Sequence, residues 1–102
     1  MSALTLPNNM SIFDQISIRI IKEQALIIGP LAWDEAKKVS GLTVVDPKKG
    51  EVTVSGDGKQ VVDGLVSRYV RLFGRTSQEV CKGAVQDLVV DMKAEEVPTS
   101  LK

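Results

Sequence analysis

Four stretches of the chain repeat apolar residues at the three- and four-residue spacing of an amphipathic helix. The first begins with Ser11 as an N-cap and continues to about Ile28. Two apolar stripes follow this stretch and leave a narrow polar face, so we expect the helix to be central in the fold or shared with a partner. Gly29 and Pro30 interrupt it, because proline lacks the amide hydrogen that a helix interior needs. A short second helix is expected to restart there and to close at Gly41.

Two longer helices are predicted in the second half of the chain. A capping box that begins at Asp57 precedes an apolar-periodic segment, and Gly74 ends that segment. A second capping box begins at Thr76 and precedes a last helix that extends to about Ala94. The second half therefore supplies a second pair of helices.

Between the two pairs the helical spacing gives way to two β-branched runs, at residues 42–45 and 51–54. Pro47 and Gly50 lie in the short loop between the runs and suit a tight turn, which predicts a β-hairpin over residues 42–54. The predicted fold is mainly α, with four helices in two pairs and this small hairpin between them. The residues expected to form the core are Ile16, Ile20, Ile27, Leu31, Leu65, Tyr69, Leu72, Val80, Ala84 and Leu88.

The chain of 102 residues has the size of one domain. We expect residues 11–94 to form it, flanked by flexible tails at 1–10 and 95–102 that contain proline and small polar residues. No basic start followed by an apolar run marks a secretory signal, and charges interrupt every apolar stretch before it could span a membrane. We therefore expect a cytoplasmic protein that does not interact with membranes.

Composition narrows the chemistry. Thirteen Lys and Arg residues balance thirteen Asp and Glu residues, which disfavours strong non-specific binding to nucleic acid. The chain has no His, the commonest general base and metal ligand, and its one cysteine, Cys81, lies on the apolar stripe of the last predicted helix. We expect no catalytic residues, no metal site and no cofactor.

The first predicted helix carries two apolar stripes, which a fold of four short helices could hardly cover alone. Ile18 and Ile21 lie on its second stripe. Trp33 follows the break after the helix and is either an anchor of the core or an exposed anchor of an interface. These three residues are the candidate interface, and the expected partner is a second copy of the chain.

The segment from Ile27 to Val39 resembles small helical modules appended to bacterial signalling kinases and response proteins. Those modules carry a Gly-Pro-(Ile/Leu)-Ala element between an apolar helix and a short second helix. The residues that match are Gly29, Pro30, Leu31, Ala32 and Ala36. The resemblance implies a small interaction or regulatory domain and no catalytic residues.

Arg68, Arg71 and Arg75 recur at helical spacing and form a candidate basic ridge near the end of the third predicted helix. A ridge of this kind either faces solvent or binds an acidic partner or nucleic acid.

The segment from Val66 to Leu88 resembles the helix-turn-helix of bacterial DNA-binding regulators, in which the second helix enters the major groove. The residues that carry the resemblance are Val70, Gly74, Val80, Ala84 and Leu88. It implies that the DNA contacts are Arg75, Ser77, Gln78, Lys82 and Gln86. However, Glu79 and Asp87 add acidic groups to the same helix, and these oppose docking on DNA.

The function favoured by the sequence is a small, non-catalytic interaction or regulatory domain of the bacterial cytoplasm, homodimeric and bound to another protein. The first alternative is a helix-turn-helix DNA-binding regulator, so nucleic acid is a less favoured partner. The second alternative is a small enzyme or ligand-binding protein.

Overall fold

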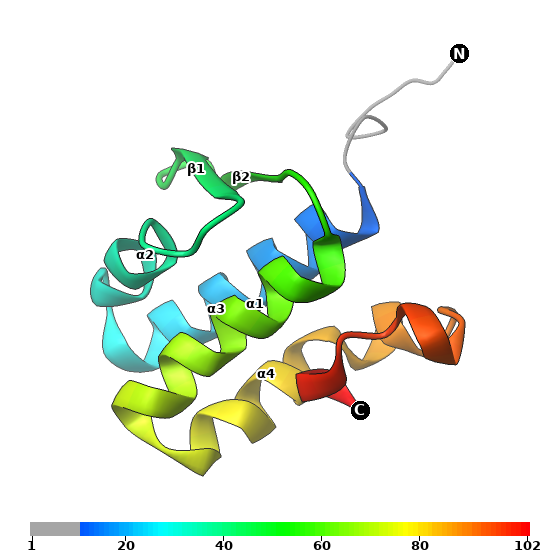
Figure 1. The fold of residues 1–102 in the computed structure, drawn as a ribbon. Coiled ribbons are helices and arrows are strands. Elements are labelled where there is room, and N and C mark those ends of the chain that lie inside the picture. Colours follow the sequence, from blue (N-terminus) through cyan, green and yellow to red (C-terminus); the bar gives the residue numbers. More distant parts are fainter. Residues whose placement is uncertain (1–10) are drawn as a thin grey trace.

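The computed structural model describes residues 11–102, so the tail predicted at residues 1–10 lies outside the described part. The described chain is mainly helical, with four α-helices and one antiparallel sheet of two strands (Figure 1). Two short 3₁₀ helices, η2 and η3, follow the last α-helix. In chain order the elements are α1 (Ile12–Ile28), α2 (Leu31–Ala36), β1 (Leu42–Asp46), β2 (Glu51–Val54), α3 (Gly58–Phe73), α4 (Arg75–Val89), η2 (Ala94–Glu96) and η3 (Thr99–Leu101).

The start of α1 is fixed by a capping box and by a contact with the sheet. Ser11 Oγ accepts the backbone amide of Asp14 at 3.0 Å, and an Asp14 oxygen accepts the amide of Ser11 at 3.1 Å. The other Asp14 oxygen accepts the backbone amide of Val54 at 2.7 Å. One buried carboxylate therefore joins the first turn of the helix to the end of β2.

α1 is the central helix, because it packs against α2, α3 and α4 and most extensively against α4. The predicted division of the helices into two sequential pairs is thus not confirmed. The hydrophobic core forms where these helices meet. Its fully buried side chains include Ile16, Ile20, Ile21, Val62, Leu65, Tyr69 and Val85.

The break after α1 is sharp. Gly29 takes a positive φ of 72°, and the chain restarts as a helix directly after Pro30. The helix α2 is shorter than predicted, because it ends at Ala36 and a turn leads to Gly41, whose φ is 85°. A Cβ at Gly41 would lie 2.6 Å from Val61 Cγ2, so both backbone conformation and space require glycine there.

The strands β1 and β2 pair in antiparallel register, with Leu42 opposite Val54 and Val44 opposite Val52, and the register shifts beyond Val44. Leu42 and Val52 are buried, so the ribbon contributes one apolar face to the core.

A single residue, Gly74, separates α3 from α4. Asp57 caps α3 by accepting the amides of Lys59 and Gln60. The capping box predicted at Thr76 is wrong, because α4 already begins at Arg75 and its N-cap, Gly74, has no side chain to donate or accept. The glycine reverses the chain in one residue at a φ of 87°, which leaves no room for a separate capping turn.

The C-terminal residues do not form the free tail that was predicted for 95–102. Val97 and Leu101 are buried against the helices. Asp63 of α3 accepts both the backbone amide of Ser100 at 3.0 Å and its hydroxyl at 2.6 Å, while the Gln78 amide donates to the Ser100 carbonyl. Apolar burial and these three hydrogen bonds hold the segment over α3 and α4.

Candidate functional site

A large apolar surface lies at the end of the molecule where α1 and α3 finish and α2 begins (Figure 1). We call it the apolar end. Its side chains range in exposure from 38% for Phe73 to 80% for Leu26. The apolar end consists of Leu26, Ile27, Leu31, Leu72 and Phe73.

Three residues of the apolar end, Ile27, Leu72 and Phe73, continue the stripes that form the core. Ile27 follows buried Ile20 at the helical spacing of seven residues, and yet it is 63% exposed. Leu72 and Phe73 lie three and four residues beyond buried Tyr69. The predictions that Ile27, Leu31 and Leu72 lie in the core are therefore wrong. Helices α1 and α3 each run about one turn past the elements that cover them, so the last residues of their stripes emerge.

Two buried polar contacts hold this end together. The Tyr69 hydroxyl donates to the Ala32 carbonyl at 2.6 Å and links α3 to α2. The Gln24 side-chain amide donates to the Ser77 carbonyl at 3.1 Å and to Cys81 Sγ at 3.4 Å, which links α1 to α4. Since buried polar groups are costly without partners, these bonds fix the relative positions of all four helix ends.

Opposite charges flank the apolar end. Glu23 and Asp34 are exposed on the side of α1 and α2, next to Ile27 and Leu31 in helical spacing. Arg71 and Arg75 are exposed on the side of α3 and α4, next to Leu72 and Phe73. Exposed acidic residues therefore lie close in sequence to the apolar residues of α1 and α2, and exposed basic residues lie close in sequence to those of α3.

The predicted interface of Ile18, Ile21 and Trp33 does not form a common surface. Ile21 is fully buried in the core of its own chain, so it cannot contact a partner, and that prediction is wrong. Ile18 is half-buried beside the hairpin turn near Gly50, and Trp33 is half-buried against the core. The two-stripe pattern indicated an apolar helix correctly, but the intramolecular neighbours cover its middle and leave its last turn open.

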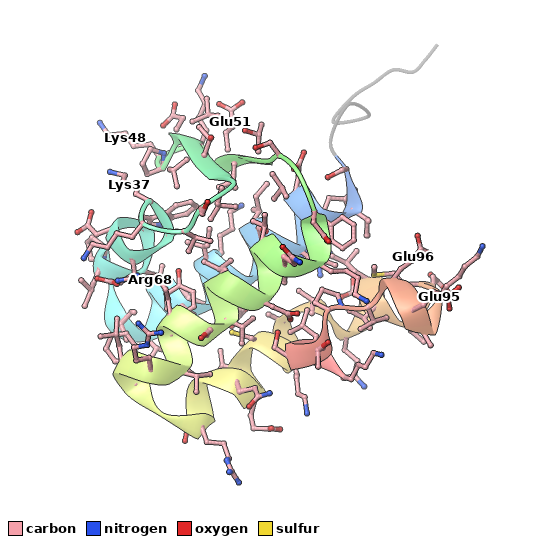
Figure 2. The ribbon with its side chains drawn as sticks, viewed as in Figure 1. Lys37, Lys48, Glu51, Arg68, Glu95 and Glu96 are labelled. Carbon is pink, nitrogen blue, oxygen red and sulfur yellow. The ribbon has the colours of Figure 1, made fainter. Side chains whose placement is uncertain are left out.

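The basic ridge is divided in the structure. Arg68 turns toward α2, where its Nε and Nη2 lie 2.9 and 2.8 Å from Glu35 Oε1 (Figure 2). Lys38 Nζ contacts the other oxygen of Glu35 at 3.1 Å. Arg68 first, and then Lys38, lower the pKa of the Glu35 carboxyl below its ordinary value. Arg71 and Arg75 are exposed, and no ion pair links them to the other described residues.

The five DNA contacts implied by the helix-turn-helix resemblance are not all available. Ser77 is buried, which corrects its assignment as an exposed contact, and the side-chain amide of Gln78 is bonded to Ser100. Lys82 Nζ lies 3.8 Å from Glu79 Oε2, three residues earlier in α4. Arg75 and Gln86 are exposed. The C-terminal segment thus occupies part of the surface that a recognition helix would present to DNA.

The single thiol has the environment of a packing residue. Cys81 is fully buried, and burial raises its pKa to about 11, with the Gln24 contact acting in the opposite direction. Within residues 11–102, no three Cys, Asp or Glu side chains lie close enough together to hold a metal ion. In the same part of the chain, no helix combines the length and apolar character needed to cross a membrane.

In comparisons with protein-family models, with curated proteins and with solved structures, nothing matches this chain significantly.

Proposed function

We propose that this protein is a small, non-catalytic interaction module that forms a homodimer through the apolar end. The single observation that carries the proposal is the exposure of five large apolar side chains at one end of a well-packed chain. Together they expose on the order of 500 Å² of apolar surface, close to the apolar share of the roughly 800 Å² that each partner buries in a standard interface.

Charge complementarity favours a second copy as the occupant. A two-fold axis through the apolar end would bring the acidic edge of one copy, Glu23 and Asp34, toward the basic edge of the other, Arg71 and Arg75. Both edges would then be neutralised without any other charged partner, as suits a chain with zero net charge. The first helix would then contribute to the dimer, as the sequence predicts, but through its last turn rather than its middle.

The resemblance to bacterial signalling modules supports the same surface. The segment from Ile27 to Val39 supplies Ile27 and Leu31 to the apolar end. We propose that the dimer acts as a regulatory domain in a bacterial cytoplasm, where it joins another protein.

Sedimentation equilibrium at micromolar concentration tests the dimer. We expect the natural chain to dimerise and Ile27→Asp to be monomeric, because the aspartate would have to be desolvated at the centre of the interface. Val90→Asp is the matched control, since Val90 is 74% exposed and lies past the far end of α4, about 22 Å of helix away. Circular dichroism should show both variants folded. A monomeric natural chain, or a control as disruptive as Ile27→Asp, would contradict the proposal.

A charge exchange separates this symmetric dimer from other modes of association. One variant reverses the basic edge (Arg71→Glu with Arg75→Glu), and the other reverses the acidic edge (Glu23→Arg with Asp34→Arg). Each variant alone should remain monomeric, because like charges would meet across the axis. Mixed together, the two should form a heterodimer. Failure of the mixture to associate would show that the edges do not meet in this way.

A further inference from the structure

A polar groove runs along α3 beneath the turn that joins α2 to β1, and it shares Arg71 with the basic edge of the apolar end. It consists of two adjoining hollows with volumes of about 230 and 320 Å³, which share Val39, Ser40 and Gly64 in their walls. The larger hollow falls within the roughly 300–1,000 Å³ typical of small-molecule sites, and the smaller one adjoins it.

One end of the groove is strongly basic. Lys38, Arg68 and Arg71 line it, together with Ser67. Glu35 is buried, and its two carboxylate oxygens are engaged by Arg68 and Lys38. This carboxylate neutralises one of the three cations, so two positive charges remain in a hollow that also offers hydroxyl donors. Glu35 holds the Arg68 side chain in a fixed orientation. An anion that binds Arg68 therefore costs less side-chain conformational entropy than one that binds a mobile arginine.

The other end of the groove is polar but not basic. It is lined by Ser55, Asp57 and Gln60, and Val61 forms part of its wall. One Asp57 oxygen caps α3, and no described hydrogen bond occupies the other. This end therefore suits a body that carries hydroxyl or amino donors.

Gly64 keeps the two ends connected. It lies in the interior of α3, where glycine is about 1 kcal/mol less favourable than alanine. Its missing side chain leaves the middle of the groove open. A Cβ there would meet only Val39 Cγ1, at the ordinary contact distance of 3.5 Å, so the fold itself does not require glycine at this position.

From these observations we infer that the groove binds a small phosphate monoester whose body is a sugar or a nucleoside. The phosphate would lie among Lys38, Arg68 and Arg71, and the polar body would extend past Gly64 toward Asp57 and Gln60. Phosphate suits the basic end because arginine and lysine form charge-assisted hydrogen bonds with its oxygens. This inference goes beyond the proposed dimer, and the two share one residue, Arg71, which lines the groove and belongs to the basic edge.

Nuclear magnetic resonance titration of the ¹⁵N-labelled full chain tests the site with three probes: inorganic phosphate, ribose 5-phosphate and adenosine monophosphate. We expect phosphate to shift the amides of Ser40, Gly64 and Ser67 with a millimolar Kd. At least one monoester should bind about tenfold tighter than phosphate, equivalent to about 1.4 kcal/mol of added contacts. Ribose 5-phosphate and adenosine monophosphate binding equally would identify a sugar phosphate, whereas preference for adenosine monophosphate would identify a nucleotide. No shifts at these amides up to 10 mM ligand would overturn the inference.

Arg71→Gln and Arg75→Gln form a matched pair. Both remove an exposed arginine of the basic edge, but only Arg71 lines the groove. We expect Arg71→Gln to weaken monoester binding about tenfold and Arg75→Gln to leave it within about twofold. Equal losses in two variants that sediment as the natural chain does would mean diffuse attraction of polyanions, and the site would be rejected. Both arginines belong to the basic edge of the proposed dimer, so an effect of dimerisation on binding would also give equal losses of affinity. Sedimentation of both variants would detect such a change in dimerisation.

Gly64→Leu distinguishes the contribution of the phosphate to the affinity from that of the body of the ligand. Leucine favours the helix and would extend into the groove, so the variant should keep its fold and its weak affinity for inorganic phosphate. The advantage of the monoester over phosphate should disappear. A folded Gly64→Leu variant that keeps the full advantage would show that the body does not follow the groove. Gly64→Ala is the control for the change in helix propensity and should reduce the advantage less.

Discussion

Two apolar surfaces of the α3–α4 hairpin differ in what covers them. Over the middle of the hairpin, Val97 and Leu101 are buried, and Ser100 is bonded to both helices. At the apolar end, no described residue performs this role for Leu72 and Phe73. The different exposure of the two surfaces depends on whether another part of the chain reaches them. Burial is decided by the arrangement of the elements rather than by local sequence.

The strongest test of this contrast compares one leucine with one isoleucine. Leu101→Ala should lower the free energy of unfolding by about 2 kcal/mol, since it removes buried methyl groups and leaves a cavity. Ile27→Ala should change the stability of the monomer by less than about 0.5 kcal/mol, because the side chain is exposed. Urea denaturation at concentrations well below dimer formation measures both. Similar losses in the two variants would abolish the distinction between a covered and an open surface.

The hydrogen bonds of the C-terminal segment give the next effect. Asp63→Ala removes the acceptor of two hydrogen bonds from Ser100 and should cost about 1–2 kcal/mol. Limited proteolysis should then cleave near Thr99 sooner than in the natural chain. Asp91→Ala is a suitable control, because Asp91 is an exposed acidic residue with no described hydrogen bond or ion pair. Unchanged proteolysis in Asp63→Ala would mean that apolar burial alone holds the segment.

The rigidity of the open end depends on a different contact. Tyr69→Phe removes the donor to the Ala32 carbonyl but keeps the buried ring, so it should cost about 1 kcal/mol. The dimer should also weaken, because α2 would lose a link that positions Leu31 beside α3. Thermal denaturation and sedimentation equilibrium measure the two effects. A loss of stability with no change in association would show that the apolar end forms without this bond.

The smallest expected effect is one of pH. The folded-state pKa of Glu35 is lowered by Arg68 and Lys38, so its ionised form stabilises the fold at pH values above the ordinary value of 4.5. This contribution is lost as the pH falls below 4.5 through the lowered pKa. Urea titrations between pH 7 and pH 3 should therefore give a shallower acid-induced loss of stability for Glu35→Gln than for the natural chain. Equal slopes would mean that Glu35 titrates alike in the folded and unfolded chain.

The sequence predicted the starts of α1 and α3 and the breaks between helices, because these depend on local chemistry, whereas α2 ends at Ala36 and α4 at Val89, both earlier than predicted. Ser11 and Asp57 are N-caps as expected, and the breaks at Gly29 and Gly74 follow from glycine conformations that other residues disfavour. The C-terminal packing could not be predicted in this way. Its partners, Ser100 and Asp63, are 37 residues apart, and no periodicity marks the short segment that joins them to the fold.

The candidate surfaces were harder to predict for a related reason. Helical spacing shows which side of a helix is apolar, but it does not show how far along that side the neighbours extend. Ile27 and Ile20 are equivalent in spacing, and only the three-dimensional structure separates them by exposure. The groove likewise depends on Lys38 and Arg68 meeting across two elements at Glu35. The arginine spacing alone indicated a ridge, not a hollow.

The double role of Asp14 has a consequence for how the molecule opens. Its carboxylate bonds to the amides of Ser11 and Val54, which are far apart in the chain. If either the first turn of α1 or the end of β2 frays alone, the buried Asp14 carboxylate loses one of its hydrogen-bond donors. We therefore expect the two distant segments to open as one cooperative unit. In hydrogen exchange, the amide of Val54 should then exchange at the rate at which the start of α1 opens.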